Sequence, residues 1–108
     1  MKLINLIEYL VNTDKLKQLY ANEKLNIESE ALIIYMRETL AIDSEIKFFE
    51  IEETEDNLVF EKEGVQYVQL FPMDHAIELI ELDLDLKGKG YSNLEIAKRL
   101  LEYRIKDA

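Results

Sequence analysis

The sequence predicts a single α+β domain, spanning residues 1–108, in which one layer of helices packs on a small sheet. Three observations lead to this prediction. Apolar residues recur at helical spacing near both ends of the chain, whereas the middle is rich in β-branched and aromatic residues between turn signals. A length of 108 residues suits one hydrophobic core. The predicted order is N-terminal helices, a three-stranded antiparallel meander and two C-terminal helices.

The first forty residues predict helices. Five apolar side chains recur at three- and four-residue steps over residues 2–12, namely Leu3, Ile4, Ile7, Leu10 and Val11. Thr13 or Asp14 can cap a continuation of this pattern to about residue 24. Residues 31–36 are apolar on nearly every face of a helix. We therefore predict a central buried helix over residues 27–40, with Asn26 as its N-cap.

Strands are predicted after residue 44. Residues 46–51 are rich in β-branched and aromatic side chains, and residues 54–57 are typical of a turn. A second strand over residues 58–62 and a third over residues 65–71 flank Glu63-Gly64, which supplies the tight turn of a hairpin. These three segments predict the antiparallel meander.

Two helices are predicted at the C-terminal end. The spacing of Met73, Ile77, Ile80 and Leu84 predicts a helix over residues 73–87, although residues 82–86 alternate as a strand would. Ser92 and Glu95 form a capping box for the last helix, whose predicted buried stripe is Ile96, Ala97, Leu100, Leu101 and Ile105. Two exposed ion pairs are expected on this helix, Glu95 with Arg99 and Glu102 with Lys106.

Charge is distributed unevenly along the chain. There are 13 Lys and Arg against 23 Asp and Glu, which gives a formal net charge of −10. Residues 1–42 contribute −1, residues 43–85 contribute −12, and residues 86–108 contribute +3. A field of this sign repels phosphate backbones, so direct binding of nucleic acid is disfavoured. It favours a cationic protein partner, a multivalent cation or simple solubility.

The sequence contains no cysteine, which excludes disulfides, thiolate metal sites and a cysteine nucleophile. No apolar run approaches the roughly 18 residues of a membrane span. Glu8, Asn12 and Asp14 interrupt the N-terminal segment where a signal peptide would be continuously apolar. We therefore expect a cytoplasmic protein that does not contact a membrane.

Catalytic motifs are weak in this sequence. It has no nucleophile elbow, phosphate loop, dinucleotide fingerprint or zinc-protease motif. His75 is the only histidine, with Asp74 before it and Glu78 three residues after it. This group favours a solvated helix face, because a di-metal site in a helical bundle needs more than one histidine. We expect no cofactor and no enzymatic activity.

One segment is partly similar to a calcium-binding loop. Asp83, Asp85 and Gly88 match three positions of the loop pattern. Lys87 stands at the third ligand position, and Leu94 stands where the loop has a bidentate glutamate. Because both replacements remove ligand oxygens, the segment favours a turn between two helices, and no metal site is predicted.

The charge map predicts a non-enzymatic, acidic protein-binding module. Its size and charge resemble those of immunity proteins and nucleic-acid mimics, which cover the cationic groove of a nuclease. The expected partner is therefore a basic protein such as a nuclease toxin. The expected contact residues are the acids of the predicted hairpin and of the following helix: Glu50, Glu52, Glu53, Glu55, Asp56, Glu61, Glu63, Asp74, Glu78, Glu81, Asp83 and Asp85.

The alternative is a small structural or regulatory domain that forms a homodimer through an apolar helix or sheet face. In that case the acidic residues only keep the protein soluble. Salt separates the two hypotheses, because screening dissociates a complex held by opposite charges and leaves an apolar dimer intact.

Overall fold

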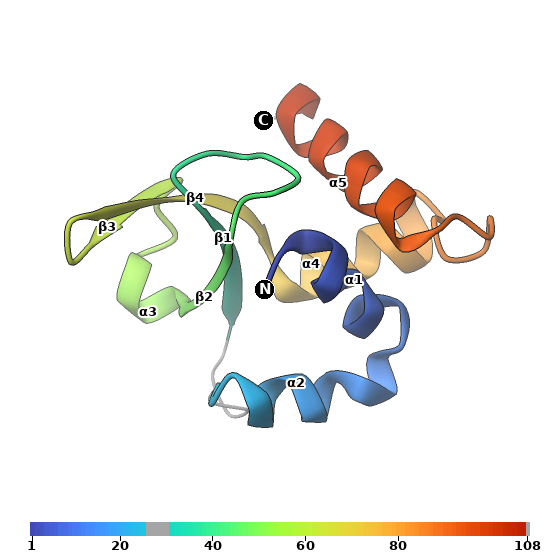
Figure 1. Cartoon of the computed structure of the whole chain (residues 1–108), viewed down its shortest axis with the longest axis horizontal. Coiled ribbons are helices and arrows are strands. Elements are labelled where there is room, and N and C mark those ends of the chain that lie inside the picture. The colour runs from blue at the N-terminus through green and yellow to red at the C-terminus, as the bar shows by residue number, and fades with distance from the viewer. Residues whose placement is uncertain (26–30, 108) are drawn as a thin grey trace.

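The computed structural model describes residues 1–25 and 31–107, and the side chains of residues 1–25 and 31–106. Within these residues the fold is α+β, with a four-stranded antiparallel sheet and most helices gathered beside one face (Figure 1). The helical elements are α1 (Leu3–Val11), the 3₁₀ turn η1 (Thr13–Lys15), α2 (Leu16–Asn22), α3 (Ile51–Thr54), α4 (Met73–Glu78), the π-helical η2 (Leu79–Asp83) and α5 (Asn93–Asp107). The strands are β1 (Leu32–Arg37), β2 (Ile46–Glu50), β3 (Val59–Lys62) and β4 (Val65–Pro72).

The predicted helix over residues 27–40 is wrong. Residues 32–37 form the inner strand β1, while residues 27–30 and the predicted cap Asn26 lie outside the described residues. All five residues from Leu32 to Met36 are buried, because both faces of β1 are covered. A strand buried on both faces loses the alternation of apolar and polar residues, so its sequence is also compatible with a buried helix.

The strands follow the order β2-β1-β4-β3, and each neighbouring pair is antiparallel. The hairpin of β3 and β4 is confirmed, and Glu63 and Gly64 have φ angles of 53° and 80°, as a type I′ turn requires. The predicted three-stranded meander is only partly correct, because β2 pairs with β1 and not with β3. Helix α3 occupies part of the connection in which the sequence predicts only a turn.

The sheet is curled, and the curl brings its two outer strands together. In a flat sheet of this order β2 and β3 would lie about 14 Å apart. Yet the rings of Phe49 on β2 and Phe60 on β3 have their centroids 5.1 Å apart. Tyr35 on β1 and Tyr67 on β4 also pack against Phe49, at 5.5 and 5.1 Å. The concave face is therefore closed by its own aromatic side chains.

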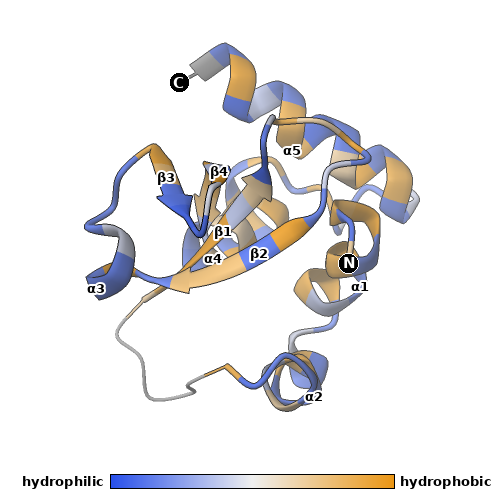
Figure 2. Ribbon diagram, turned by 60° about the vertical axis from the view of Figure 1, so that its left-hand side comes forward, coloured by the Kyte–Doolittle hydropathy of each residue, from blue (hydrophilic) through white to orange (hydrophobic). Residues whose placement is uncertain are grey.

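The larger hydrophobic cluster lies on the other face of the sheet. Helices α1, α4 and α5 and the π-helical η2 contribute buried side chains to it, and β1 contributes Ile34 and Met36. Figure 2 shows hydrophobic colour along much of β1, which separates the two clusters. The predicted N-terminal helix is confirmed by α1, whose buried residues are Leu3, Leu6, Ile7 and Leu10.

The predicted helix over residues 73–87 ends early. Helix α4 continues as η2, in which the Leu84 amide donates to the Leu79 carbonyl at 2.9 Å, and helical structure stops at Asp83. Residues 82–86 form no strand. Asp85 has a φ of 48°, which breaks the regular pattern that the sequence suggests.

Helix α5 begins as predicted. The Glu95 amide donates to the Ser92 hydroxyl at 3.2 Å, and the expected pairs Glu95–Arg99 and Glu102–Lys106 are present at 3.0 and 2.8 Å. Four members of the predicted stripe are buried, but Ile105 is 59% exposed. The prediction for Ile105 is wrong because the last turn of α5 extends beyond the core (Figure 1). No helix in the described part of the chain is long and apolar enough to cross a membrane.

A pair of substitutions on α5 tests this orientation. Leu100→Ala removes a fully buried side chain and should lower the free energy of unfolding by about 2–4 kcal/mol. Ile105→Ala acts on an exposed side chain and should change it by about 0.5 kcal/mol or less. Urea denaturation followed by circular dichroism measures both values. Equal losses for the two variants would contradict the orientation of α5.

Candidate functional site

The twelve acidic residues selected from the sequence fall into two groups. The first group surrounds α3, the turn after it and the β3–β4 hairpin, and consists of Glu50, Glu52, Glu53, Glu55, Asp56, Glu61 and Glu63. The second group follows α4, η2 and the segment after them, and consists of Asp74, Glu78, Glu81, Asp83 and Asp85. All are exposed except Glu50, which is partly buried. Figure 1 shows α3 and β3 together at one end of the molecule, away from α4.

The first group is the denser one, and we call it the acidic end. Between residues 50 and 63 the sequence has seven carboxylates and a single base, Lys62. The Lys62 ammonium donates to Glu53 at 2.5 Å and lies 5.5 Å from the ring centroid of Phe49. The hydrogen bond to Glu53 raises the pKa of Lys62. This pair ties α3 to β3, although an exposed ion pair adds little to stability.

The backbone after α3 is strained. Glu55 and Asp56 are consecutive residues with φ angles of 54° and 59°, in the left-handed region that non-glycine residues rarely adopt. Each such residue costs on the order of 1 kcal/mol and persists only where the surrounding structure holds it. The turn at residues 55–58 is therefore stabilised by interactions from elsewhere in the fold.

Buried polar side chains supply these interactions. Tyr35 and Gln69 lie opposite each other on β1 and β4. The Tyr35 hydroxyl donates to the Asn57 carbonyl at 2.6 Å, and the Gln69 amide nitrogen donates to the Asp56 carboxylate at 3.0 Å and lies 3.3 Å from the Tyr35 hydroxyl. Thr54, also buried, accepts from the Asp56 amide at 3.3 Å. These hydrogen bonds hold the turn against strands β1 and β4.

Two large apolar residues are exposed immediately after this turn. Leu58 is 60% exposed and Val59 is 52% exposed. The Leu58 carbonyl accepts from the Gln69 amide at 2.8 Å, which fixes the backbone beneath the pair. Figure 2 shows this hydrophobic colour at the start of β3, after a hydrophilic loop that leads from α3. An exposed apolar pair within a segment rich in carboxylates has the composition of a protein interface.

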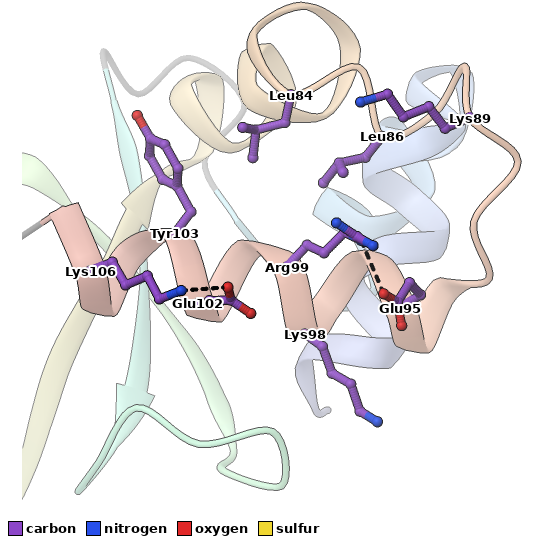
Figure 3. A pocket seen from close by; sticks show the side chains of 9 residues that line it. All are labelled: Leu84, Leu86, Lys89, Glu95, Lys98, Arg99, Glu102, Tyr103 and Lys106. Atoms are coloured by element: carbon purple, nitrogen blue, oxygen red, sulfur yellow. Dashed lines mark hydrogen bonds and ion pairs between the residues drawn. The ribbon is translucent and has the colours of Figure 1, made fainter.

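A pocket with a volume of about 630 Å³ lies along α5, between this helix and the segment that follows η2. Figure 3 shows Leu84 and Leu86 across the pocket from α5, while Lys98 points to another side of the helix. Arg99 is engaged by Glu95 and lies 4.3 Å from the Tyr91 ring centroid. Of the six charged residues that line it, Glu95 is paired with Arg99, and Glu102 is paired with Lys106.

Metal and acid–base sites receive little support from the geometry. The described residues contain no group of three or more His, Asp or Glu side chains that could hold a metal ion. This result covers Asp83 and Asp85 as well as the residues around His75. The His75 ring is exposed and packs edge-on against Phe71, with the centroids 5.4 Å apart.

Comparisons with known proteins give no family for this chain. It matches no protein-family model, no curated protein and no solved structure. The class that the fold and the site define is therefore an α+β domain with a strained acidic turn at one end.

Four residues of this site escape the sequence predictions: Tyr35, Leu58, Val59 and Gln69. Gln69 lies between Val68 and Leu70 in a predicted strand, and this apolar context is the one signal in the sequence that could have marked it. Its partner Tyr35 is hidden by the wrong prediction of a helix. The exposure of Leu58 and Val59 depends on tertiary packing alone.

Removing one hydroxyl tests the buried network. Tyr35→Phe removes the short hydrogen bond to the Asn57 carbonyl and one of the acceptors of the Gln69 side-chain amide, and should lower the free energy of unfolding by about 1 kcal/mol. Tyr67→Phe is the matched control, since Tyr67 belongs to the same aromatic cluster and its hydroxyl makes no hydrogen bond among the described residues. Thermal denaturation of the two variants measures the difference. An equal midpoint for both would show that the network does not hold the turn.

Proposed function

We propose that the protein is a non-catalytic binding module that recognises a basic surface of another protein through the acidic end. The observation that carries this proposal is the exposed pair Leu58 and Val59, which follows the strained turn at Glu55 and Asp56 in a segment that carries seven carboxylates. Strain at a turn that buried side chains hold in place is typical of functional sites. Simple solubility needs exposed acids but needs neither strain nor exposed leucine.

The chemistry of the surface favours a cationic protein partner. Carboxylates such as Glu52 and Glu61 raise the rate of encounter with a positive surface and orient it. Leu58 and Val59 supply apolar area, which can be buried at the centre of an interface while the charged groups form its rim. The fixed turn lowers the entropy lost on binding, because the backbone is ordered before the partner arrives.

A nuclease is the class of partner that this surface fits best within the proposal. An enzyme that cleaves nucleic acid has a groove lined with cations for phosphate groups, and a compact acidic surface can occupy that groove. The protein would then act as an immunity or inhibitor protein. The second group of acids, on α4 and η2, lies away from the acidic end and is not needed for this contact.

Charge reversal at two ends of the molecule tests the proposal. Glu52→Lys with Glu61→Lys changes the acidic end, and Glu78→Lys with Glu81→Lys makes the same change of charge on α4 and η2. All four side chains are exposed and none makes an ion pair among the described residues. Each protein is immobilised on a resin and incubated with a lysate of the source organism at low salt. Captured proteins are then identified by mass spectrometry. The affinity of a captured partner is then measured by calorimetry.

The proposal predicts that the wild-type protein and the α4–η2 variant capture the same basic protein. The variant of the acidic end should bind it at least about tenfold more weakly, and binding should weaken as salt is raised. Leu58→Ala should also weaken binding while leaving the melting temperature almost unchanged, since the side chain is exposed. Equal loss in both charge variants, or recovery of this chain alone as a salt-insensitive dimer, would contradict the proposal.

A further inference from the structure

A second groove lies beside the acidic end, on the convex side of β4. The end of β4, the first turn of α4 and the last turns of α5 form its walls, and Leu58 forms its rim. The lining residues are Leu58, Gln69, Leu70, Phe71, Pro72, His75, Tyr103 and Arg104. Its volume is about 380 Å³, near the lower end of the range for small-molecule sites. Most of the wall is apolar.

Among the described residues that line this wall, Arg104 is the one with a permanent charge. Its Nε donates to the Gln69 carbonyl at 3.2 Å, which fixes the side chain at the groove. Among the described residues, no carboxylate lines the groove and Arg104 makes no ion pair. Arg99, on the same helix, is by contrast bound to Glu95. The remaining N–H groups of Arg104 are therefore available to an anion.

Aromatic rings make up much of the rest of the wall. The ring centroid of Phe71 lies 5.4 Å from that of His75 and 6.3 Å from that of Tyr103. Aromatic walls favour an aromatic guest, because rings pack edge-to-face or offset at such separations. A guanidinium group favours a carboxylate, since its planar N–H groups can donate two parallel hydrogen bonds.

We propose that this groove binds a small aromatic carboxylic acid. The ring of the ligand lies among Phe71, His75 and Tyr103, and its carboxylate accepts hydrogen bonds from Arg104. Charge complementarity selects an acid over an amine, and the apolar wall selects it over inorganic anions. The volume suits one ring with a short acidic arm and excludes an extended peptide of several residues. This site is separate from the proposed protein interface, although Leu58 and Gln69 belong to both.

The experiment uses phenylacetate, phenylacetamide and phenethylamine as probes. The three compounds have similar shapes and differ in their polar group, which is a carboxylate, an amide and an ammonium group. Each is titrated into ¹⁵N-labelled full-length protein and followed by two-dimensional NMR. Phenylacetate should give saturable shifts of the Leu70, Phe71 and His75 amides. Phenylacetamide should bind about tenfold more weakly, because it lacks the charged acceptor, and phenethylamine should not bind. This series needs no variant, so it does not depend on the folding of one.

Two variants on α5 complete the test. Arg104→Gln should weaken phenylacetate binding at least about tenfold, while Arg99→Gln, one helical turn or more away in the other pocket, should leave it unchanged. The spectrum of each variant reports whether it is folded. Equal binding of phenylacetate and phenylacetamide, shifts confined to the pocket along α5, or no saturation up to about 20 mM would each overturn the proposal.

Discussion

The hydrogen-bonded pair of Tyr35 and Gln69 connects the interior of the sheet to both surfaces that we propose to be functional. Buried polar groups are costly when they lack partners, so the two side chains stabilise the conformation in which Asn57 and Asp56 satisfy them. The main chain of Gln69 extends this role, since its amide holds Leu58 and its carbonyl holds Arg104. One position on β4 thus shapes the acidic end and the groove beside it.

Curling of the sheet makes this pair possible. The ring contact between Phe49 and Phe60 joins the outer strands, and Tyr35 is enclosed beneath them. A flat sheet would leave these rings in water and would require a second layer of helices to cover them. The concave face is instead closed by four aromatic side chains. Beside these side chains, only the short helix α3 and the strained turn cover this face within the described part of the chain. The acidic residues of both segments are exposed to solvent.

The sequence predicts those elements whose environment differs between their two sides. Helices α1 and α5 have one buried face, and the β3–β4 hairpin has a specific turn, so their patterns are readable. Strand β1 is buried on both faces and was therefore indistinguishable from a buried helix, and the error in the meander follows from that one strand. Charge composition selects the acids, but the network beneath them joins residues 34 positions apart and requires the strand pairing to be known.

Amide hydrogen exchange at the turn tests most directly whether buried side chains hold the acidic end in place. The backbone amide of Glu55 donates to the Ile51 carbonyl, and that of Asn57 donates to the Thr54 carbonyl. The backbone amide of Asp56 donates to the Thr54 hydroxyl. On β4, the backbone amide of Gln69 donates to the Leu58 carbonyl. The account predicts that these four amides exchange much more slowly than in an unstructured peptide, although the residues of the turn are exposed. Exchange of Glu55, Asp56 and Asn57 at the unstructured rate, while β4 stays protected, would contradict it.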